Sequence, residues 1–221
     1  MLKFLKRFSD SLIISFSGVD GAGKTTVIES FKRKLKENFG KDVVVLRHRP
    51  SILPHLSYFK YGPKKAKEKL KNSHPREGKN SSRLSSFLRF SYYYLDYLLG
   101  HIYLAILRLR GKTILFDRYY FDFIVDSRRS NIVINSRMAE FLFKFVPKPH
   151  LNVFLFAPVG VILNRKKELP ADEISMLTDK YLKLFDRLNR KYKQRFISIK
   201  NIKLNETLMK VEEEYRRILN R

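Results

Sequence analysis

The sequence contains no cysteine among its 221 residues. Disulfide bonds, zinc sites built from thiolates and cysteine nucleophiles are therefore excluded, whereas the cellular compartment is left open. Acidic residues are scarce as well, because 21 aspartates and glutamates stand against 46 lysines and arginines, for a formal net charge of +25. A charge of this size indicates an anionic partner: a phosphorylated small molecule, a nucleic acid or an acidic membrane surface.

The sequence also lacks an unbroken hydrophobic run that could cross a membrane. Its longest apolar segment, 84–109, contains Arg89, Asp96 and His101, and a central aspartate alone costs roughly 3 kcal/mol in a bilayer. We interpret this segment as a core helix whose polar residues face a cleft. No signal peptide is recognisable, since the apolar run 12–16 is too short for its hydrophobic region. We therefore expect a cytoplasmic protein with at most peripheral membrane contact.

No internal repeat, low-complexity tract or interdomain linker interrupts the chain. A length of 221 residues suits one domain, so we predict a single domain over 1–221, with a basic loop or insertion at 51–82 and a lid at 165–172. The basic loop is crowded with lysines, for which a solvated loop is the simplest interpretation: Lys60, Lys64, Lys65, Lys67, Lys69, Lys71 and Lys79.

The chain is organised around the stretch G-V-D-G-A-G-K-T at 18–25, which fits the phosphate-loop pattern G-x-x-x-x-G-K-[ST] without a mismatch. An apolar strand pattern precedes the stretch at 12–16, and an amphipathic helical pattern follows it. Glycines let the backbone turn sharply so that several N–H groups meet one phosphate, and the helix dipole adds positive potential there. This context predicts a bound nucleoside triphosphate.

Each residue of the loop then has an expected part in holding ATP and Mg²⁺. Lys24 is expected to reach the outer phosphates, and the Thr25 hydroxyl is expected to ligate Mg²⁺. The residues predicted to bind ATP are Gly18, Val19, Asp20, Gly21, Ala22, Gly23, Lys24, Thr25 and Thr26. A short hydrophobic strand at 113–116 delivers Asp117, an arrangement typical of the Walker B carboxylate that helps to hold Mg²⁺.

The alternation of elements predicts the fold class. Five strand patterns alternate with helical patterns, at 12–16, 43–46, 113–116, 151–156 and 196–199. This alternation predicts an α/β, three-layer P-loop NTPase fold, in which a five-stranded parallel sheet carries helices on both faces.

Polar residues for a second substrate follow the strands and line the long helix. Arg47 and Arg49 come at the carboxyl end of the second strand, where open α/β sheets place their ligands. The residues predicted to bind this second substrate are Arg47, Arg49, Arg89, Tyr93, Asp96 and Asp122. For the first two, a surface basic cluster is an equally simple interpretation. For Asp122 and the nearby Asp126, the alternative is a polar loop with surface ion pairs.

Three parts of the chain resemble the thymidylate kinases. They are the phosphate loop within 16–26, the Asp117-Arg118-Tyr119 motif, and the segment 151–167, which resembles that family's fourth strand and the entry into its lid. The resemblance implies an ATP- and Mg²⁺-dependent kinase of a nucleoside monophosphate, with dTMP as the first choice of acceptor. It also implies that Arg118 grips the acceptor's phosphate and that Asp20 points towards the acceptor.

The resemblance also implies where the transition-state arginine lies. Some members of the family carry that arginine in the phosphate loop and others in the lid. Gly21 occupies the loop position here, so Arg165 in the lid becomes the candidate. The implied catalytic set is Lys24, Asp20, Arg118 and Arg165.

Other features depart from the family and keep alternatives open. Asp122 and Val125-Asp126-Ser127 replace the Ser and the Ala-Tyr-Gln that thymidylate kinases carry after Asp-Arg-Tyr, and Arg47-His48-Arg49-Pro50 replaces Thr-Arg-Glu-Pro. A second hypothesis is a kinase of a sugar or glycan-linked acceptor, whose hydroxyls the two aspartates could bind. A third is a basic ATPase module that binds nucleic acid or membrane. The expected partners are a small phosphate acceptor and a second copy of the chain, with no specific nucleic acid.

Overall fold

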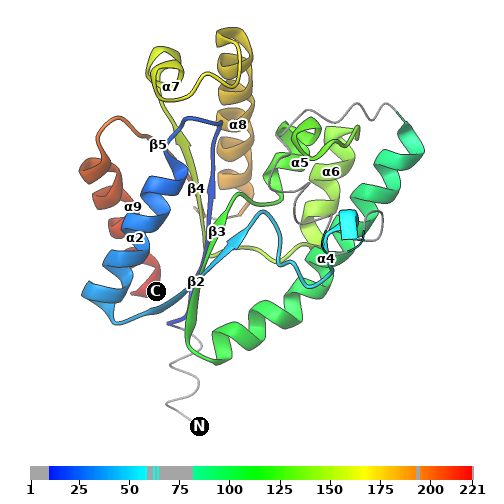
Figure 1. Ribbon diagram of the computed structural model, residues 1–221. Coiled ribbons are helices and arrows are strands. Elements are labelled where there is room, and N and C mark those ends of the chain that lie inside the picture. The colour runs from blue at the N-terminus through cyan, green and yellow to red at the C-terminus, as the bar shows by residue number, and fades with distance from the viewer. Residues whose placement is uncertain (1–9, 59–61, 63, 65–81, 193–194, 221) are drawn as a thin grey trace. The chain divides into compact units, whose positions relative to one another are not determined.

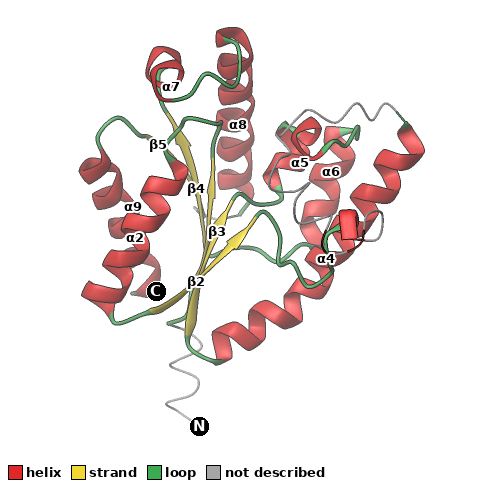
Figure 2. Ribbon diagram, viewed as in Figure 1, coloured by secondary structure: helices red, strands yellow, loops and turns green. Residues whose placement is uncertain are grey.

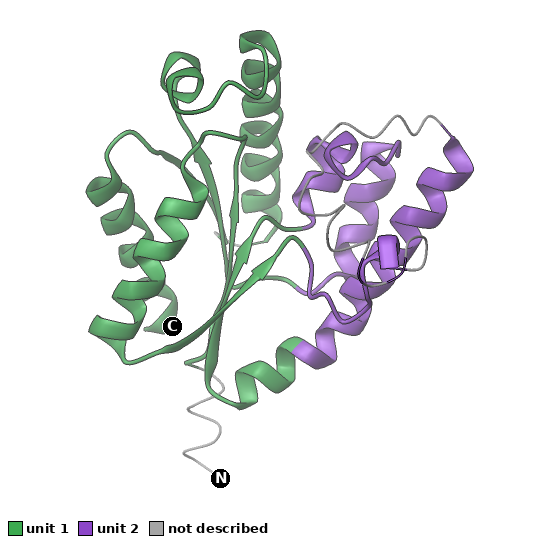
Figure 3. Cartoon of the chain, viewed as in Figure 1, with its two compact units in different colours: residues 1–48, 104–119, 148–221 green, residues 49–103, 120–147 purple. Residues whose placement is uncertain are grey.

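The computed structural model describes residues 10–58, 62, 64, 82–192 and 195–220. The chain forms two compact units (Figure 3): unit 1 comprises 1–48, 104–119 and 148–221, and unit 2 comprises 49–103 and 120–147. The single domain expected over 1–221 stays a prediction. Most of the lysine-rich stretch within 60–79 lies outside the described residues.

Unit 1 is built on a five-stranded parallel sheet with the strand order β2-β3-β1-β4-β5 (Figures 1 and 2). The strands are β1 (Ile13–Ser17), β2 (Asp42–Arg47), β3 (Lys112–Asp117), β4 (Leu151–Phe156) and β5 (Phe196–Lys200). Its helices are α2 (Lys24–Phe39), α7 (Val159–Arg165), α8 (Ala171–Lys191) and α9 (Leu204–Leu219). The predicted parallel sheet and fold class are confirmed.

Helices cover both faces of this sheet because alternate side chains of each strand point to opposite sides. Val153 and Leu155 of β4 belong to the core cluster that also contains Phe31 of α2 and Val211 of α9. Phe154, between them, instead stacks on Tyr181 of α8, with ring centroids 4.8 Å apart. The two hydrophobic layers hold the sheet rigid, so the loops at its carboxyl edge have a fixed base.

The register of the central strands gathers the functional loops at one edge. Phe16 of β1 pairs with Asp117 of β3, and Ser17 pairs with Phe154 of β4. Asp117 also pairs with Arg47 at the end of β2. The phosphate loop, the Asp117-Arg118 segment and the β4–α7 connection therefore leave the sheet at its carboxyl edge, where such folds bind ligands.

Unit 2 contains most of the long helix α4 (Arg83–Leu109), whose last turns belong to unit 1. It also contains α5 (Phe121–Val125), the 3₁₀ turn η1 (Ser127–Ser130), α6 (Ser136–Leu142) and the 3₁₀ turn η2 (Phe143–Phe145). Its core is aromatic: Tyr120 packs edge-on against Tyr97 and Phe123, and its ring stacks on Phe143. This cluster gives unit 2 a hydrophobic centre of its own.

The structure corrects the expectation that α4 is buried as a core helix. Phe90, Tyr97 and Leu104 are buried, but an apolar stripe along the helix is exposed. The stripe consists of Leu84, Leu88, Leu95, Leu99, Ile102, Ile106 and Leu109. The apolar pattern of 84–109 could not show what covers the helix, because a helix that is apolar all round can be covered by its own chain or by another one. Within the described residues, no helix is long and apolar enough to cross a membrane.

His150, just before β4, makes folding sensitive to acid. The Ile13 N–H donates a 2.9 Å hydrogen bond to its Nδ1, and burial together with Arg108 and Arg195 lowers the pKa of His150 from 6.5 to about 4. Between pH 6.5 and 4, His150 is protonated in the unfolded chain but remains neutral in the folded chain. We expect the free energy of unfolding to fall as pH drops from 6.5 to 4, by up to about 3 kcal/mol.

Urea unfolding at several pH values tests this expectation. His150→Gln should remove the pH dependence of the unfolding free energy that we assign to His150 between pH 6.5 and 4. At pH 7.5 the variant should be less stable than the wild type. The same slope between pH 6.5 and 4 in both proteins would show that other groups control the acid sensitivity.

Candidate functional site

The phosphate loop, residues 18–25, has the backbone that its glycines predict. Gly21 and Gly23 both have a φ of 85°, in the left-handed region. A Cβ added at Gly23 would lie 2.5 Å from Asn201 Nδ2, and one at Gly21 would lie 2.9 Å from Ile162 Cγ2. A side chain at either position would strain the backbone and would require a neighbouring side chain to shift.

Side-chain donors hold three carbonyl groups of the loop. Lys24 Nζ donates to Val19 O at 2.8 Å, Arg118 donates to Gly18 O at 3.1 Å, and Asn201 Nδ2 donates to Ala22 O at 2.8 Å. These three hydrogen bonds brace the backbone of the loop. Such a cradle of ordered backbone at a helix start suits a phosphate group.

The first turn of α2 completes the cradle. The helix begins at Lys24, and its first turn contains no acidic side chain. The amides of a first helical turn have no acceptor within the helix, and the helix dipole favours an anion at that end. Thr25 and Thr26 are both exposed there. The residues present therefore fit a bound triphosphate.

The two residues predicted to ligate a metal ion, Thr25 and Asp117, both carry side-chain oxygens. Thr25 follows the loop, and Asp117 ends β3 with its Oδ2 3.9 Å from Arg47 Nε. Arg47 keeps 84% of its side chain exposed. The described residues contain no group of three acidic or histidine side chains that could hold a metal alone. That pattern fits Mg²⁺, which proteins bind through one or two carboxylates with substrate phosphates.

Arg118 is held against the phosphate loop. Its guanidinium donates to Gly18 O and, at 2.7 Å, to Asp20 Oδ1, and both side chains are about nine-tenths buried. The sequence expected both residues in the site, and the structure brings them into direct contact.

The predicted lid begins where α7 ends. Residues 166–170 connect α7 to α8, so the segment 165–172 includes this connection. Arg165 is exposed, and its guanidinium donates to Asn201 O at 3.2 Å and to Ile202 O at 3.3 Å. In this structure the candidate transition-state arginine therefore rests on the connection between β5 and α9.

Asn201 is a residue that sequence reasoning missed. Its side chain bonds Ala22 O and accepts a 2.9 Å hydrogen bond from Thr207 Oγ1, and it is 5% exposed. Its backbone oxygen accepts from Arg165. The available signal was a polar residue directly after the last buried strand, at the carboxyl edge of the sheet.

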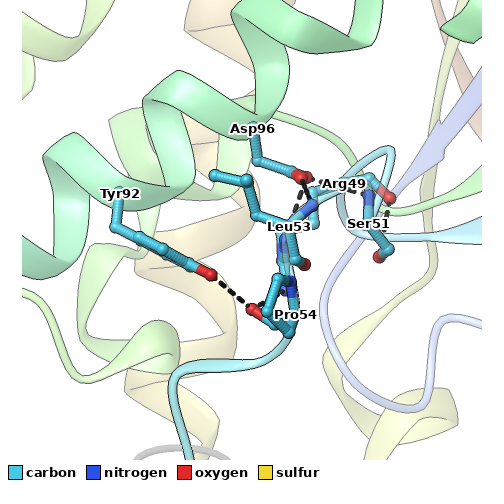
Figure 4. A network of polar contacts seen from close by, with 6 residues as sticks. All are labelled: Arg49, Ser51, Leu53, Pro54, Tyr92 and Asp96. Atoms are coloured by element: carbon cyan, nitrogen blue, oxygen red, sulfur yellow. Dashed lines mark hydrogen bonds and ion pairs between the residues drawn. The ribbon is translucent and has the colours of Figure 1, made fainter. Parts of the chain in front are cut away.

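In unit 2, Arg49 and Asp96 form a buried ion pair (Figure 4). Arg49 lies 2.9 Å from Asp96 Oδ2, and Asp96 is completely buried. Asp96 also accepts hydrogen bonds from the amides of Ser51 and Leu53, at 2.8 and 2.6 Å. Both carboxylate oxygens of Asp96 thus bind the loop 49–54. The predicted role of Asp96 in acceptor binding stays a prediction.

Further contacts fix the same loop on α4. Arg49 donates to Leu53 O at 3.0 Å, and Tyr92 donates its hydroxyl to Pro54 O at 2.7 Å. Gly100 allows Pro50 to approach, because a Cβ there would lie 2.5 Å from Pro50 Cγ. The loop 49–54 is therefore held in a defined position on α4 within unit 2.

Arg89, Tyr93 and His55 surround the ion pair. The Arg49 guanidinium lies 5.2 Å from the Tyr93 ring centre, and Arg89 forms a hydrogen bond with the same tyrosine. Burial raises the pKa of Tyr93, and burial with both arginines lowers the pKa of His55. Arg89 Nε is buried and has no hydrogen-bond partner among the described residues. Arg89 and Tyr93, two predicted acceptor-binding residues, thus share one cluster with Arg49.

Asp122 lies elsewhere in unit 2. It belongs to α5, is completely buried and has its Oδ2 3.9 Å from Arg129 Nε. The alternative interpretation of Asp122 was a polar loop with surface ion pairs. Asp122 does form an ion pair, but the pair with Arg129 is buried. Asp126 is buried as well, at 9% exposure.

Comparisons with known proteins agree with this arrangement. The family model described as thymidylate kinase matches residues 16–218. Among solved structures, the thymidylate kinase of Candida albicans is similar with a TM-score of 0.62 and 16% identity, covering 95% of this chain and 93% of that one. That of Ehrlichia chaffeensis is similar with a TM-score of 0.58 and 17% identity, covering 92% and 98%. No curated protein matches the chain.

Proposed function

The chain belongs to the thymidylate kinase family, and from this premise we propose that it transfers the terminal phosphoryl group of ATP to dTMP, giving ADP and dTDP. The observation that carries the proposal is the family match over 16–218, which includes the phosphate loop, Asp117, Arg118 and Arg165. The family acts on small nucleotide substrates and generally uses ATP and Mg²⁺. The predicted ATP-dependent phosphotransferase is thereby confirmed at the level of the family.

Phosphoryl transfer depends on alignment and on neutralising the charge of the equatorial oxygens. The loop amides and Lys24 hold the ATP phosphates, and Lys24 exchanges Val19 O for a phosphate oxygen. Thr25 and Asp117 would hold Mg²⁺, which supplies further neutralisation when bound. Arg118 of unit 1 orients the phosphate of the acceptor. The roles of Arg89 and Tyr93 in acceptor binding stay predictions.

Arg165 completes the charge clamp in this proposal. It must leave the carbonyls of Asn201 and Ile202 to do so, and two neutral acceptors hold a guanidinium less firmly than a phosphate does. Its release is coupled to closure of the connection 166–170, which excludes water from the transfer.

ADP release with a panel of acceptors tests the proposed function. Purified protein, ATP and Mg²⁺ are mixed with dTMP, dUMP, dCMP, other monophosphates or phosphorylated sugars, and ADP is measured by a coupled assay. We expect the highest kcat/KM with dTMP. Turnover of a sugar phosphate with none of dTMP would replace the proposal by the glycan-acceptor alternative.

The two alternatives are not favoured. The aspartates that pointed to sugar hydroxyls are buried, Asp122 beside Arg129. A nucleic-acid-binding module predicts binding that weakens steeply with salt, whereas turnover of a small acceptor should change far less between 50 and 200 mM salt. Assays at these two concentrations separate the classes. Localisation in the cytoplasm and peripheral membrane contact stay predictions.

We also propose that the chain forms a homodimer through α4. The exposed stripe on this helix repeats at intervals of three, four and seven residues, as a helix-packing seam does. Covering such a stripe with its own copy removes apolar surface from water.

Ile102→Glu should therefore shift the protein from dimer to monomer in sedimentation experiments, because it places a charge in the seam. Met209→Glu, at an equally exposed position on α9, is the control and should keep the dimer. A wild-type protein that sediments as a monomer at 100 μM would contradict this assignment.

A further inference from the structure

Cations are concentrated along the amino edge of the sheet of unit 1, the edge at which its five parallel strands begin (Figure 1). The described segments that lead into or begin these strands are 10–12, 41–42, 108–112, 148–150, 191–192 and 195. They contain two acidic residues, Asp10 and Asp42, against seven lysines and arginines. The seven cations are Lys41, Arg108, Arg110, Lys112, Lys148, Lys191 and Arg195.

Both acidic residues of the amino edge already lie beside a cation of the same edge. Asp10 Oδ2 is 3.8 Å from Lys41 Nζ, and Asp42 Oδ2 is 3.1 Å from Lys112 Nζ. Pairing of both acids leaves an excess of five positive charges in these segments. An edge of this composition attracts anionic partners.

Two lysines of the amino edge crowd one another around a tyrosine. The ammonium nitrogens of Lys148 and Lys191 lie 5.9 and 5.6 Å from the centre of the Tyr192 ring. Burial and the nearby Lys191 lower the pKa of Lys148 to about 8. Repulsion between like charges of this kind is relieved when an anion approaches them.

Two arginines of the amino edge likewise crowd His150. Arg108 Nε donates to Ser11 O at 2.7 Å, which fixes this guanidinium beside the start of β1. Burial lowers the pKa of His150, and the positive charges of Arg108 and Arg195 lower it further. Cations from the end of α4 and from the segment before β5 therefore act on the same imidazole.

The strand spacing spreads these charges over a broad surface. Neighbouring strands lie about 4.8 Å apart, so the starts of five strands span about 20 Å. A membrane that contains anionic lipids presents negative charge over such an area, and each nearby lysine or arginine adds to the attraction. Single-stranded nucleic acid is usually bound by aromatic rings that stack on its bases, whereas every described aromatic residue of unit 1 is buried or half-buried. The amino edge therefore fits a membrane better.

We propose that the amino edge of unit 1 docks the protein on the surface of a membrane that contains anionic lipids. This edge gives the expected peripheral membrane contact a location. The phosphate loop leaves the sheet at the opposite edge, about 15–20 Å away, because strands of five and six residues rise about 3.3 Å per residue. Docking therefore leaves the nucleotide site open to water and requires neither ATP nor the acceptor.

Co-sedimentation with lipid vesicles tests the proposal. The protein is mixed, in about 100 mM salt, with vesicles of phosphatidylcholine alone or with about 30% phosphatidylglycerol, and the bound fraction is measured against lipid concentration. We expect binding to the anionic vesicles to be at least about tenfold tighter than to the neutral ones. The combined variant Arg110→Gln, Lys191→Gln and Arg195→Gln, called the edge variant, removes three exposed cations. It should weaken binding to anionic vesicles on the order of 100-fold, because each basic residue near such a surface contributes about fivefold.

The matched control is the combined variant Arg33→Gln, Lys180→Gln and Lys210→Gln. It removes three exposed cations near the middle of α2, α8 and α9, so its net charge equals that of the edge variant. The control should bind anionic vesicles within about twofold of the wild type, because its substitutions lie away from the amino edge. Both variants should keep wild-type ADP release with the acceptor that gives the highest turnover, which shows that they fold.

Three results would overturn the proposal. An equal loss of vesicle binding in the edge variant and in the control means that net charge alone is responsible. Wild-type protein that binds both kinds of vesicle equally, or neither, has no anionic-membrane surface. Tighter binding of double-stranded DNA than of anionic vesicles, lost in the edge variant, makes the edge a nucleic-acid surface. If the edge variant does not fold, as judged by circular dichroism, Lys191→Glu replaces it and should weaken vesicle binding by about tenfold or more.

Discussion

Replacing Lys24 with alanine lowers kcat by about 100- to 1,000-fold, the range found when one preorganised charge-stabilising donor is removed from an active site. Lys24 is 7% exposed, and its ammonium group holds Val19 O at 2.8 Å. The substitution removes both the brace of the loop and the cation that meets the outer phosphates. Steady-state ADP release with dTMP, with folding checked by circular dichroism, measures the loss.

Two further variants make this result specific. Lys36→Ala removes an exposed lysine from the last turn of the same helix and should keep wild-type turnover. Arg165→Ala should lower kcat by about tenfold or more, because it removes a transition-state charge. If Arg165→Ala keeps normal turnover while Lys24→Ala is inactive, the assignment of the lid arginine is wrong.

Asp96→Ala lowers the free energy of unfolding by about 3–5 kcal/mol, the range found when one partner of a buried ion pair is removed. Asp96 is completely buried, so its loss leaves Arg49 as an uncompensated buried cation. The amides of Ser51 and Leu53 lose their acceptor at the same time. Urea denaturation at pH 7.5 measures the change, which is large for a protein of marginal stability.

Matched variants separate the ion pair from a general effect of lost charge. Asp186→Ala removes an exposed partner of Arg190 and should change the unfolding free energy by at most about 1 kcal/mol. The double variant Arg49→Met with Asp96→Leu removes both charges and should recover much of the loss, because apolar replacements of buried pairs are often neutral. A loss below about 1 kcal/mol in Asp96→Ala would contradict a buried pair.

Local sequence patterns predicted the fold well because periodicity and glycine chemistry act over short distances. The five strands and the phosphate loop are all found where expected. Element boundaries were predicted less accurately: the strand expected at 12–16 is Ile13–Ser17, and the strand expected at 43–46 is Asp42–Arg47.

The partners of charged residues could not be predicted in the same way. A surface basic cluster was one interpretation of Arg49, but this residue is buried against Asp96, 47 positions further along the chain. The bond between Asn201 and Ala22 spans 179 positions. No local pattern encodes pairs at such separations, because they form only when tertiary packing brings the elements together.

Asn201 has a consequence for the order of events during synthesis. The ribosome delivers residues from the amino terminus onwards, and segments fold as they emerge. The phosphate loop emerges early, but Ala22 lacks the side chain that braces it until Asn201 has been translated. The nascent chain can therefore complete this brace of its phosphate loop only after β5 has been made, 179 positions after Ala22.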